Sequence, residues 1–303
     1  MAFSEKFEDA LLLVAEKVDG NQYLTAIKNA FTAYMPFIIV GSFATLFNTL
    51  ICSTSIGLAA LIPAAASLKP AFTAINFATM SFMTIPIVFL IAMNLAKNDN
   101  LPPQLAGVAA ACAYITVIPQ TVTVLVDGVA NSAAGLASTT LGAQGLFIGM
   151  IVAVIAEKIF ARLMKFEAIK IKMPPSVPAA ISQSFNTLIP ILITLTITAV
   201  GGILFYLATG SYLNEWVYSV IQSPLEIIFQ SPVGIIGIVI ISQIFWFLGI
   251  HGGLIISPIR NPLMSAAIAA NTAAVAAGSV AKPAGHNGFL DLLHRRWRCG
   301  NDL

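Results

Sequence analysis

The chain has 303 residues, of which 58% are hydrophobic and 9% are charged, and its mean hydropathy is +0.89. Because soluble domains have roughly a quarter of their residues charged, this composition excludes a soluble globular protein and indicates a polytopic membrane protein. The net charge of +2 is too small to indicate nucleic acid as a partner. The three cysteines (Cys52, Cys112 and Cys299) have neither disulfide nor metal-site spacing, so we expect no metal site.

Apolar segments near the length of a membrane crossing dominate the chain after residue 28. Residues 3–19 first place apolar side chains at three- and four-residue steps, which predicts an amphipathic helix at the membrane interface. A helix needs about 20 residues to cross a bilayer. We predict about six spans, at residues 29–51, 72–96, 104–126, 141–155, 181–208 and 231–250. The fold class is therefore an all-α membrane helix bundle, with kinks expected at Pro36, Pro86 and Pro119.

The connections between these spans differ in composition. Residues 127–140 form a Gly/Ala/Ser/Asn-rich loop, and residues 211–230 carry Tyr212, Trp216 and Tyr218, which is typical of a segment lying at the membrane interface. After the sixth span, residues 252–277 are apolar but interrupted by two prolines, Arg260 and Asn261. Broken backbone at membrane depth must be buried or line a cavity, so we predict a re-entrant segment there.

Basic residues are concentrated in alternate connections. The N-terminal 28 residues, the 97–103 turn and the 157–172 stretch hold nine Lys and Arg, whereas 52–71, 127–140 and 211–230 hold one. Cytoplasmic connections carry the excess of Lys and Arg. We therefore expect a multi-pass cell-membrane protein with its N-terminus in the cytoplasm.

The sixth predicted span ends in an imidazole flanked by glycines and preceded by aromatic rings. An ionisable group at membrane depth must find a partner inside the protein, so His251 is a candidate binding residue. Gly249, Gly252 and Gly253 permit close approach of backbone or ligand. Rings beside a hydrogen-bonding group suit a sugar, which has apolar faces and polar edges. The alternative is that His251 caps a kink and Phe245–Phe247 pack against neighbours or lipid.

The remaining polar residues of the spans are uncharged. No predicted span core contains Asp or Glu, which argues weakly against a proton- or cation-coupled carrier. No Walker loop or hydrolase or metalloprotease motif is present, so we predict no catalytic residue and no cofactor. Neutral hydrogen-bonding side chains suit either a cavity for a polyol or helix-helix contacts. They include Gln104, Thr116, Gln120, Gln144, Gln183, Ser184, Asn186 and Thr187.

Three stretches resemble a known family in order and spacing. Residues 246–252, Trp-Phe-Leu-Gly-Ile-His-Gly, resemble the Trp-Phe-Phe-Gly-Ile-His-Gly signature of the IIC components of the bacterial phosphoenolpyruvate-dependent sugar phosphotransferase system. The lactose/cellobiose/diacetylchitobiose branch is the most similar. Residues 24–36 before the first span and 172–185 at the entry to the fifth agree as well.

The resemblance implies a homodimeric permease that binds a disaccharide within the membrane and works with the IIB and IIA components. IIB phosphorylates the sugar as it reaches the cytoplasm. His251 occupies the position of the family histidine that hydrogen-bonds the sugar, with Gly249 and Gly252 beside it. Asn261 also matches a family position near the substrate. No match exists here to the family's later Glu-Pro motif.

The end of the chain departs from the family pattern. Residues 285–303 hold two of the three histidines after an Ala/Gly-rich run, which indicates an atypical basic tail or a slipped reading frame. We therefore predict an incomplete IIC-type membrane domain over 1–284, with weak or absent transport by the chain alone. An ion-coupled transporter or channel and an inactive truncated permease fragment are the alternative functions.

Overall fold

The computed structural model describes residues 20–54, 57–126, 129–169, 171, 174 and 177–247. It also describes residues 260–274, except 262, 266, 269 and 273. Together the described residues form two compact units. Unit 1 comprises the described residues of Met35–Ser81 and those from Ser219 onward, and unit 2 comprises Gln22–Tyr34 and Phe82–Tyr218. The predicted amphipathic helix at 3–19 and the tail at 285–303 lie outside the described residues.

Two long apolar helices confirm the first and fifth predicted spans. They are α2 (Gln22–Cys52) and α8 (Ala179–Thr209), each with 31 residues and therefore roughly 46 Å long at the helical rise. This length exceeds the hydrocarbon core, which is ~30 Å thick. Large apolar side chains are exposed on both helices, for example Phe37 at 53% and Leu207 at 73%, as expected of surfaces that face lipid.

The second predicted span is divided into shorter helical pieces. The short 3-10 helix η2 (Pro63–Leu68) leads into α3 (Lys69–Asn76) and a π-helical turn, η3 (Phe77–Ser81), and α4 (Thr84–Asn98) follows. The helix is therefore interrupted just before Pro86. Pro86 itself lies in the first turn of α4, where a missing backbone N–H costs nothing because those N–H groups have no helical partner. By length and composition, the described residues contain two helices able to cross a membrane, or three if these pieces count as one broken span.

A side-chain amide holds α3 against α2 within unit 1. Asn76 Nδ2 donates to the carbonyl of Gly41 at 3.2 Å and to Thr45 Oγ1 at 2.9 Å. A Cβ atom at Gly41 would lie 2.5 Å from Met80 Cγ, so the helices approach closely only because this residue is glycine.

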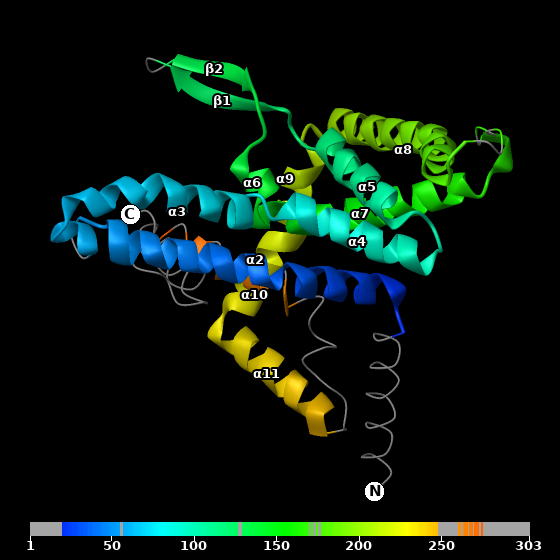
Figure 1. Ribbon diagram of the computed structural model, residues 1–303. Coiled ribbons are helices and arrows are strands. Elements are labelled where there is room, and N and C mark those ends of the chain that lie inside the picture. Colours follow the sequence, from blue (N-terminus) through cyan, green and yellow to red (C-terminus); the bar gives the residue numbers. More distant parts are fainter. Residues whose placement is uncertain are drawn as a thin grey trace, which may run out of the picture. The chain divides into compact units, whose positions relative to one another are not determined.

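Four helices form the core of unit 2. Helix α4 packs against α5 (Pro103–Val117) and α7 (Leu146–Met164), and α5 also packs against α7 and α8 (Figure 1). Ile91, Ala110 and Ala153 are completely buried between them. The alanine-rich sequence of α5 allows this close approach, as small residues do at helix interfaces in membranes.

A β-hairpin corrects the prediction of an all-α chain. Strands β1 (Thr121–Val126) and β2 (Val129–Ala134) pair antiparallel, with Thr121 opposite Ala134, and the hairpin projects from the helices (Figure 1). The predicted third span at 104–126 is therefore wrong beyond Val117, where α5 ends. Pro119 cannot continue the helix ladder, and the β-branched residues that follow fit an extended strand.

The remaining predicted elements are helical where the structure describes them. Segment 211–230 forms α9 (Leu213–Val217), the π-helical turn η6 (Tyr218–Gln222) and α10 (Ser223–Gln230), and α11 (Pro232–Phe247) covers most of the sixth predicted span. The fourth span, predicted at 141–155, corresponds to α7, which begins at Leu146 and continues to Met164. The described positions of 260–274 are helical, within the segment predicted as re-entrant. Short helices complete the connections: η1 (Leu58–Ala60), α6 (Ser138–Leu141), η4 (Ala143–Gly145) and η5 (Glu167–Ile169).

Candidate functional site

The predicted sugar-binding residues fall largely outside the described part of the chain. His251, Gly249 and Gly252 all lie there, so their arrangement stays a prediction. Asn261 is described, and it is partly buried in the helical segment 260–274.

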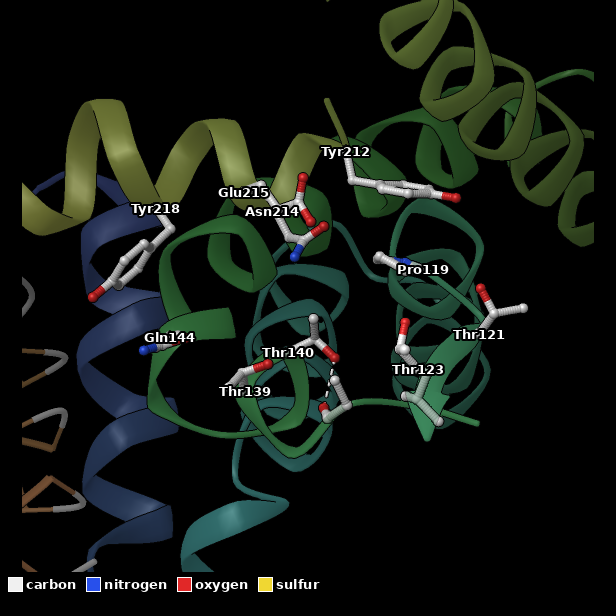
Figure 2. Close-up of a pocket in the computed structure, with 12 residues that line it drawn as sticks. Pro119, Thr121, Thr123, Thr139, Thr140, Gln144, Tyr212, Asn214, Glu215 and Tyr218 are labelled. Carbon is white, nitrogen blue, oxygen red and sulfur yellow. Dashed lines mark hydrogen bonds between the residues drawn. The ribbon is translucent and has the colours of Figure 1, made fainter. Parts of the chain in front are cut away.

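Unit 2 contains a pocket of about 500 Å³ beside the root of the hairpin. Its walls come from three segments, residues 119–123, 137–144 and 212–218, and we call it the hairpin pocket (Figure 2). Small-molecule sites in proteins measure roughly 300–1,000 Å³, so the hairpin pocket has the size of a ligand site. Sequence reasoning singled out Gln144, Tyr212 and Tyr218 as polar or aromatic residues, but it did not bring them together.

Buried hydroxyl groups fix the floor of the hairpin pocket. Tyr114 Oη donates a hydrogen bond to the carbonyl of Thr140, and Thr84 Oγ1 donates to the carbonyl of Gly142 at 2.6 Å. Thr140 Oγ1 in turn donates to the carbonyl of Ala137 at 2.8 Å (Figure 2). Because Tyr114 and Thr84 are completely buried in α5 and α4, these bonds attach the 137–142 loop to the helical core.

The aromatic wall of the pocket follows from the end of α8. Gly210 adopts a left-handed conformation, with φ of 72°, and its N–H donates to the carbonyl of Tyr206 at 2.8 Å. Glycine is the residue that adopts this helix-ending conformation without steric cost. The chain then reverses direction. The ring centroids of Tyr212 and Tyr206 lie 4.7 Å apart, and the rings of Trp216 and Phe205 meet edge-on with their centroids 5.8 Å apart.

The polar groups of the hairpin pocket suit a neutral ligand. Threonine hydroxyls and the Gln144 amide supply hydrogen-bonding groups, and Glu215 is the one charged residue among the described residues of the lining. Figure 2 shows Asn214 and Glu215 between Tyr212 and Tyr218. The Asn214 Oδ1 atom is buried and accepts no hydrogen bond from the described residues. A buried oxygen in this state is costly unless a donor reaches it.

A second polar cluster lies at the other end of α4. Lys158 Nζ is 2.7 Å from Asp99 Oδ2 and 3.3 Å from Glu157 Oε2, and it lies 5.5 Å from the centroid of the Tyr23 ring. Asp99 caps α4, and Glu157 and Lys158 follow the apolar part of α7, so all three lie outside the predicted spans. The hydrogen bond from Lys158 lowers the pKa of Asp99, whereas burial raises the pKa of the fully buried Glu157 to about 7.

Three of the other neutral residues named in the sequence, Thr116, Gln120 and Thr187, make hydrogen bonds to groups of the helices. Thr116 Oγ1 meets Thr198 Oγ1 at 3.4 Å between α5 and α8, and Thr187 Oγ1 donates to the carbonyl of Ser184 at 3.0 Å. Gln120 Nε2 donates to the carbonyl of Ile115 at 3.4 Å. In the described part of the chain, no three His, Cys, Asp or Glu side chains gather as metal ligands would. Cys52 and Cys112 are unpaired cysteines there.

Comparisons with known proteins agree on one family. Residues 28–299 match the family model described as phosphotransferase system, EIIC. The PTS system oligo-beta-mannoside-specific EIIC component of Bacillus subtilis (strain 168) is 29% identical over 275 residues, which cover 90% of this chain and 61% of that protein. The PTS system lactose-specific EIICB component of Lacticaseibacillus casei is 29% identical over 283 residues, covering 90% of this chain and 46% of that protein.

A solved structure has the same fold. It is the crystal structure of the transporter ChbC, the IIC component from the N,N'-diacetylchitobiose-specific phosphotransferase system, with a TM-score of 0.82 and 28% sequence identity. The match covers 94% of this chain and 66% of that chain. The chain therefore spans less than two thirds of the length of the two curated relatives reported above.

Proposed function

The chain belongs to the phosphotransferase-system EIIC family, in its lactose/cellobiose/diacetylchitobiose branch, and on this basis we propose that it imports a β-linked disaccharide. Cellobiose, diacetylchitobiose and lactose are the candidate substrates. The observation that carries the proposal is the family match over residues 28–299, which includes the 246–252 signature. The chain is a multi-pass membrane component of this sugar permease family, and its transport activity, its substrate, its site residues and its partners are the parts that we propose.

The names of the relatives support a disaccharide substrate. One relative is specific for oligo-beta-mannosides, one for lactose, and the solved structure belongs to a system for N,N'-diacetylchitobiose. Lactose and diacetylchitobiose are both β-linked disaccharides. Neutral sugars also suit this chain because its apolar segments carry uncharged hydrogen-bonding groups rather than carboxylates.

Within this proposal the substrate-binding residues are His251, Gly249, Gly252 and Asn261. The His251 imidazole hydrogen-bonds the sugar near the hydroxyl that receives the phosphoryl group, and the two glycines let the sugar approach the backbone. Asn261 contributes an amide that both donates and accepts hydrogen bonds.

The proposal also includes partners and an orientation. A IIB component, charged by IIA, donates the phosphoryl group on the cytoplasmic side, and the lactose relative carries its B component in the same protein. The permease is a homodimer in the cell membrane with its N-terminus in the cytoplasm. The excess of Lys and Arg in the 157–172 stretch supports this orientation.

The test is phosphorylation of candidate disaccharides by membranes that contain the chain, supplied with phosphoenolpyruvate, the general phosphocarriers, IIA and IIB. We expect a phosphorylated disaccharide whose formation requires phosphoenolpyruvate, at a low rate because the sequence predicts weak transport by this chain alone, and we expect His251→Ala to abolish it. Thr196→Ala is the control, because the Thr196 side chain is exposed on α8 and bonds only to its own helix, at the carbonyl of Leu192.

Two other outcomes would contradict the proposal. Uptake that collapses with an uncoupler and ignores phosphoenolpyruvate would identify an ion-coupled transporter. A chain that folds but neither binds sugar nor recruits IIB would be an inactive fragment.

A further inference from the structure

We propose that the hairpin pocket is a carbohydrate site in its own right, which binds one sugar ring of the neutral disaccharide without a contribution from His251. This inference rests on the proposed function for its ligand class. It is carried by the lining of the pocket, by one buried oxygen atom and by the connections that form its walls.

The lining of the hairpin pocket disfavours several ligand classes. No Lys or Arg is among the described residues that line it, so an anion such as a sugar phosphate finds no cation there. Glu215 is a single carboxylate among the lining residues and cannot by itself hold a metal ion, which needs several ligands. Hydroxyl and amide groups make up much of the wall, so a lipid chain would leave them without hydrogen bonds. A neutral ligand with many hydroxyl groups fits the polar part of this wall.

Asn214 points to a ligand that donates hydrogen bonds. Asn214 is one of the residues that line the pocket, and its Oδ1 atom is buried and accepts no hydrogen bond from the described residues. An oxygen removed from water costs ~1–3 kcal/mol when it has no donor. A sugar hydroxyl donates one hydrogen bond and accepts others, so it suits both the threonine hydroxyls and the Asn214 amide among the lining residues.

The tyrosines supply the apolar part of the recognition. Tyr212 and Tyr218 lie at either end of the stretch that carries Asn214 (Figure 2). The ring of Tyr212 is held by its contact with Tyr206 at 4.7 Å, so little conformational freedom is lost when a sugar covers it. Carbohydrate rings have apolar C–H faces, which pack against aromatic rings of this kind.

The walls of the hairpin pocket come from connections on one predicted side of the membrane. Residues 127–140 and 211–230 carry no Lys or Arg, and the distribution of basic residues assigns both to the face opposite the cytoplasm. The structure brings these two connections together in one pocket. A sugar site at this place receives the disaccharide before it is translocated, so it acts as an entry site.

Protection of a cysteine at the pocket rim tests the inference on the purified full chain. The parent protein has Cys52, Cys112 and Cys299 replaced by Ala. Thr139→Cys then places a thiol on an exposed residue of the lining, and Ala133→Cys places one on β2 outside the lining as the matched control. The rate of maleimide labelling is measured with rising concentrations of cellobiose and, as a charged comparison, cellobionate.

We expect cellobiose to slow labelling of Thr139→Cys at least threefold and to leave Ala133→Cys unchanged. Adding Asn214→Ala should remove the protection, whereas adding His251→Ala should retain it. The inference is overturned if cellobiose does not protect, if cellobionate protects equally, if Asn214→Ala retains the protection or if His251→Ala removes it. Gln144→Ala, a change at an exposed lining residue, should weaken protection and guards against misfolding of the Asn214 variant.

This experiment separates the two proposals. Phosphoenolpyruvate-dependent phosphorylation without protection of Thr139→Cys would refute only the entry site. Protection without phosphorylation would refute only the transport function.

Discussion

Helix α4 joins two polar regions of unit 2 that use different chemistry. At its C-terminus, Asp99 meets Lys158 and the buried Glu157, so this region is held by ions. At its N-terminus, Thr84 donates to the carbonyl of Gly142 below the hairpin pocket, where neutral hydroxyl and amide groups prevail. The two regions lie roughly 22 Å apart along the 15-residue helix.

This difference agrees with the distribution of basic residues along the sequence. The charged cluster joins the 97–103 turn to the 157–172 stretch, which were both assigned to the cytoplasmic side. The hairpin pocket joins 127–140 to 211–230, which were both assigned to the other side. Each region therefore pairs connections with the same predicted location, so the alternation of spans is consistent with the contacts. In the proposed orientation, the charged cluster lies on the cytoplasmic side, and the hairpin pocket lies on the opposite side.

The largest expected effect is a difference in labelling between the two ends. In a chain without its native cysteines, we place single cysteines at Ala133 on the hairpin and at Asn98 at the end of α4, two exposed positions. A membrane-impermeant maleimide should label Ala133→Cys on intact cells. It should label Asn98→Cys only after the membrane is permeabilised.

Two labelling results would contradict the assignment of the charged cluster and the hairpin pocket to their predicted sides of the membrane. The reverse pattern would mean that the orientation is inverted while the pairing of connections holds. Equal labelling of both positions on intact cells would mean that the two regions do not lie on opposite sides of the membrane.

The next largest expected effect is a loss of stability when the close packing below the hairpin pocket, at the N-terminal end of α4, is disturbed. A Cβ atom at Gly149 would lie 2.8 Å from Thr84 Cγ2 and 2.9 Å from Val88 Cγ2. Both neighbours are completely buried and β-branched, so they cannot rotate away. Gly149→Leu should therefore lower the free energy of unfolding by about 3 kcal/mol, the upper end of the range for overpacking. Thermal unfolding of the purified protein in detergent measures it.

Gly201→Leu is the control for this substitution. Gly201 is also a helical glycine, but a Cβ atom placed there would have no described atom within 4 Å apart from its chain neighbours and the backbone of its own helix. Its substitution should leave the midpoint of unfolding within about 0.5 kcal/mol of the parent, as surface changes usually do. Equal losses of stability at Gly149 and Gly201 would show that close packing does not stabilise the N-terminal end of α4.

The sequence was sufficient to predict the long helices but not the hairpin. Helices α2 and α8 follow from long apolar runs without charge, because such runs satisfy their backbone groups only as helices in a bilayer. Residues 121–126 contain no charge and continue the same run, so the sequence predicts a helix there. Pro119 was interpreted as a kink, although it follows the end of α5. Hydrophobicity alone does not distinguish a short strand from the end of a span.

The candidate pocket was less predictable because its residues are distant in sequence. Asn214 and Thr140 lie more than 70 residues apart, and neither belongs to a motif. Tyr212 and Tyr218 were interpreted as part of an interfacial aromatic belt, which uses the same residue types as a sugar site. The sequence does indicate one property that the two connections share. Both 127–140 and 211–230 lack Lys and Arg, which predicts the same side of the membrane for both.

The smallest expected effect concerns the charged end and its dependence on pH. Burial raises the pKa of Glu157 from 4.5 to about 7, so between these values the folded protein binds a proton that the unfolded chain releases. Stability therefore rises as the pH falls from about 7 toward about 4.5, and the stabilisation is absent above that range. Asp99 acts in the opposite direction, but only at lower pH, because Lys158 lowers the pKa of its carboxyl group from 3.8.

Glu157→Gln should remove this dependence, because glutamine keeps the shape of the protonated acid and does not titrate. The variant should be more stable than the parent at about pH 8 by on the order of 1–2 kcal/mol, and equal to it at about pH 5. Unfolding midpoints of parent and variant between about pH 5 and pH 8 measure this difference in stability. Titrating groups that both proteins share contribute equally to the two curves and cancel in the difference. Glu167→Gln, an exposed acid after α7, should follow the parent curve. Lower stability of Glu157→Gln than of the parent at high pH would mean that the Glu157 carboxylate of the parent is ionised there and stabilised by Lys158. The cluster of Asp99, Glu157 and Lys158 would then be a favourable ion cluster instead of a buried acid beside an ion pair.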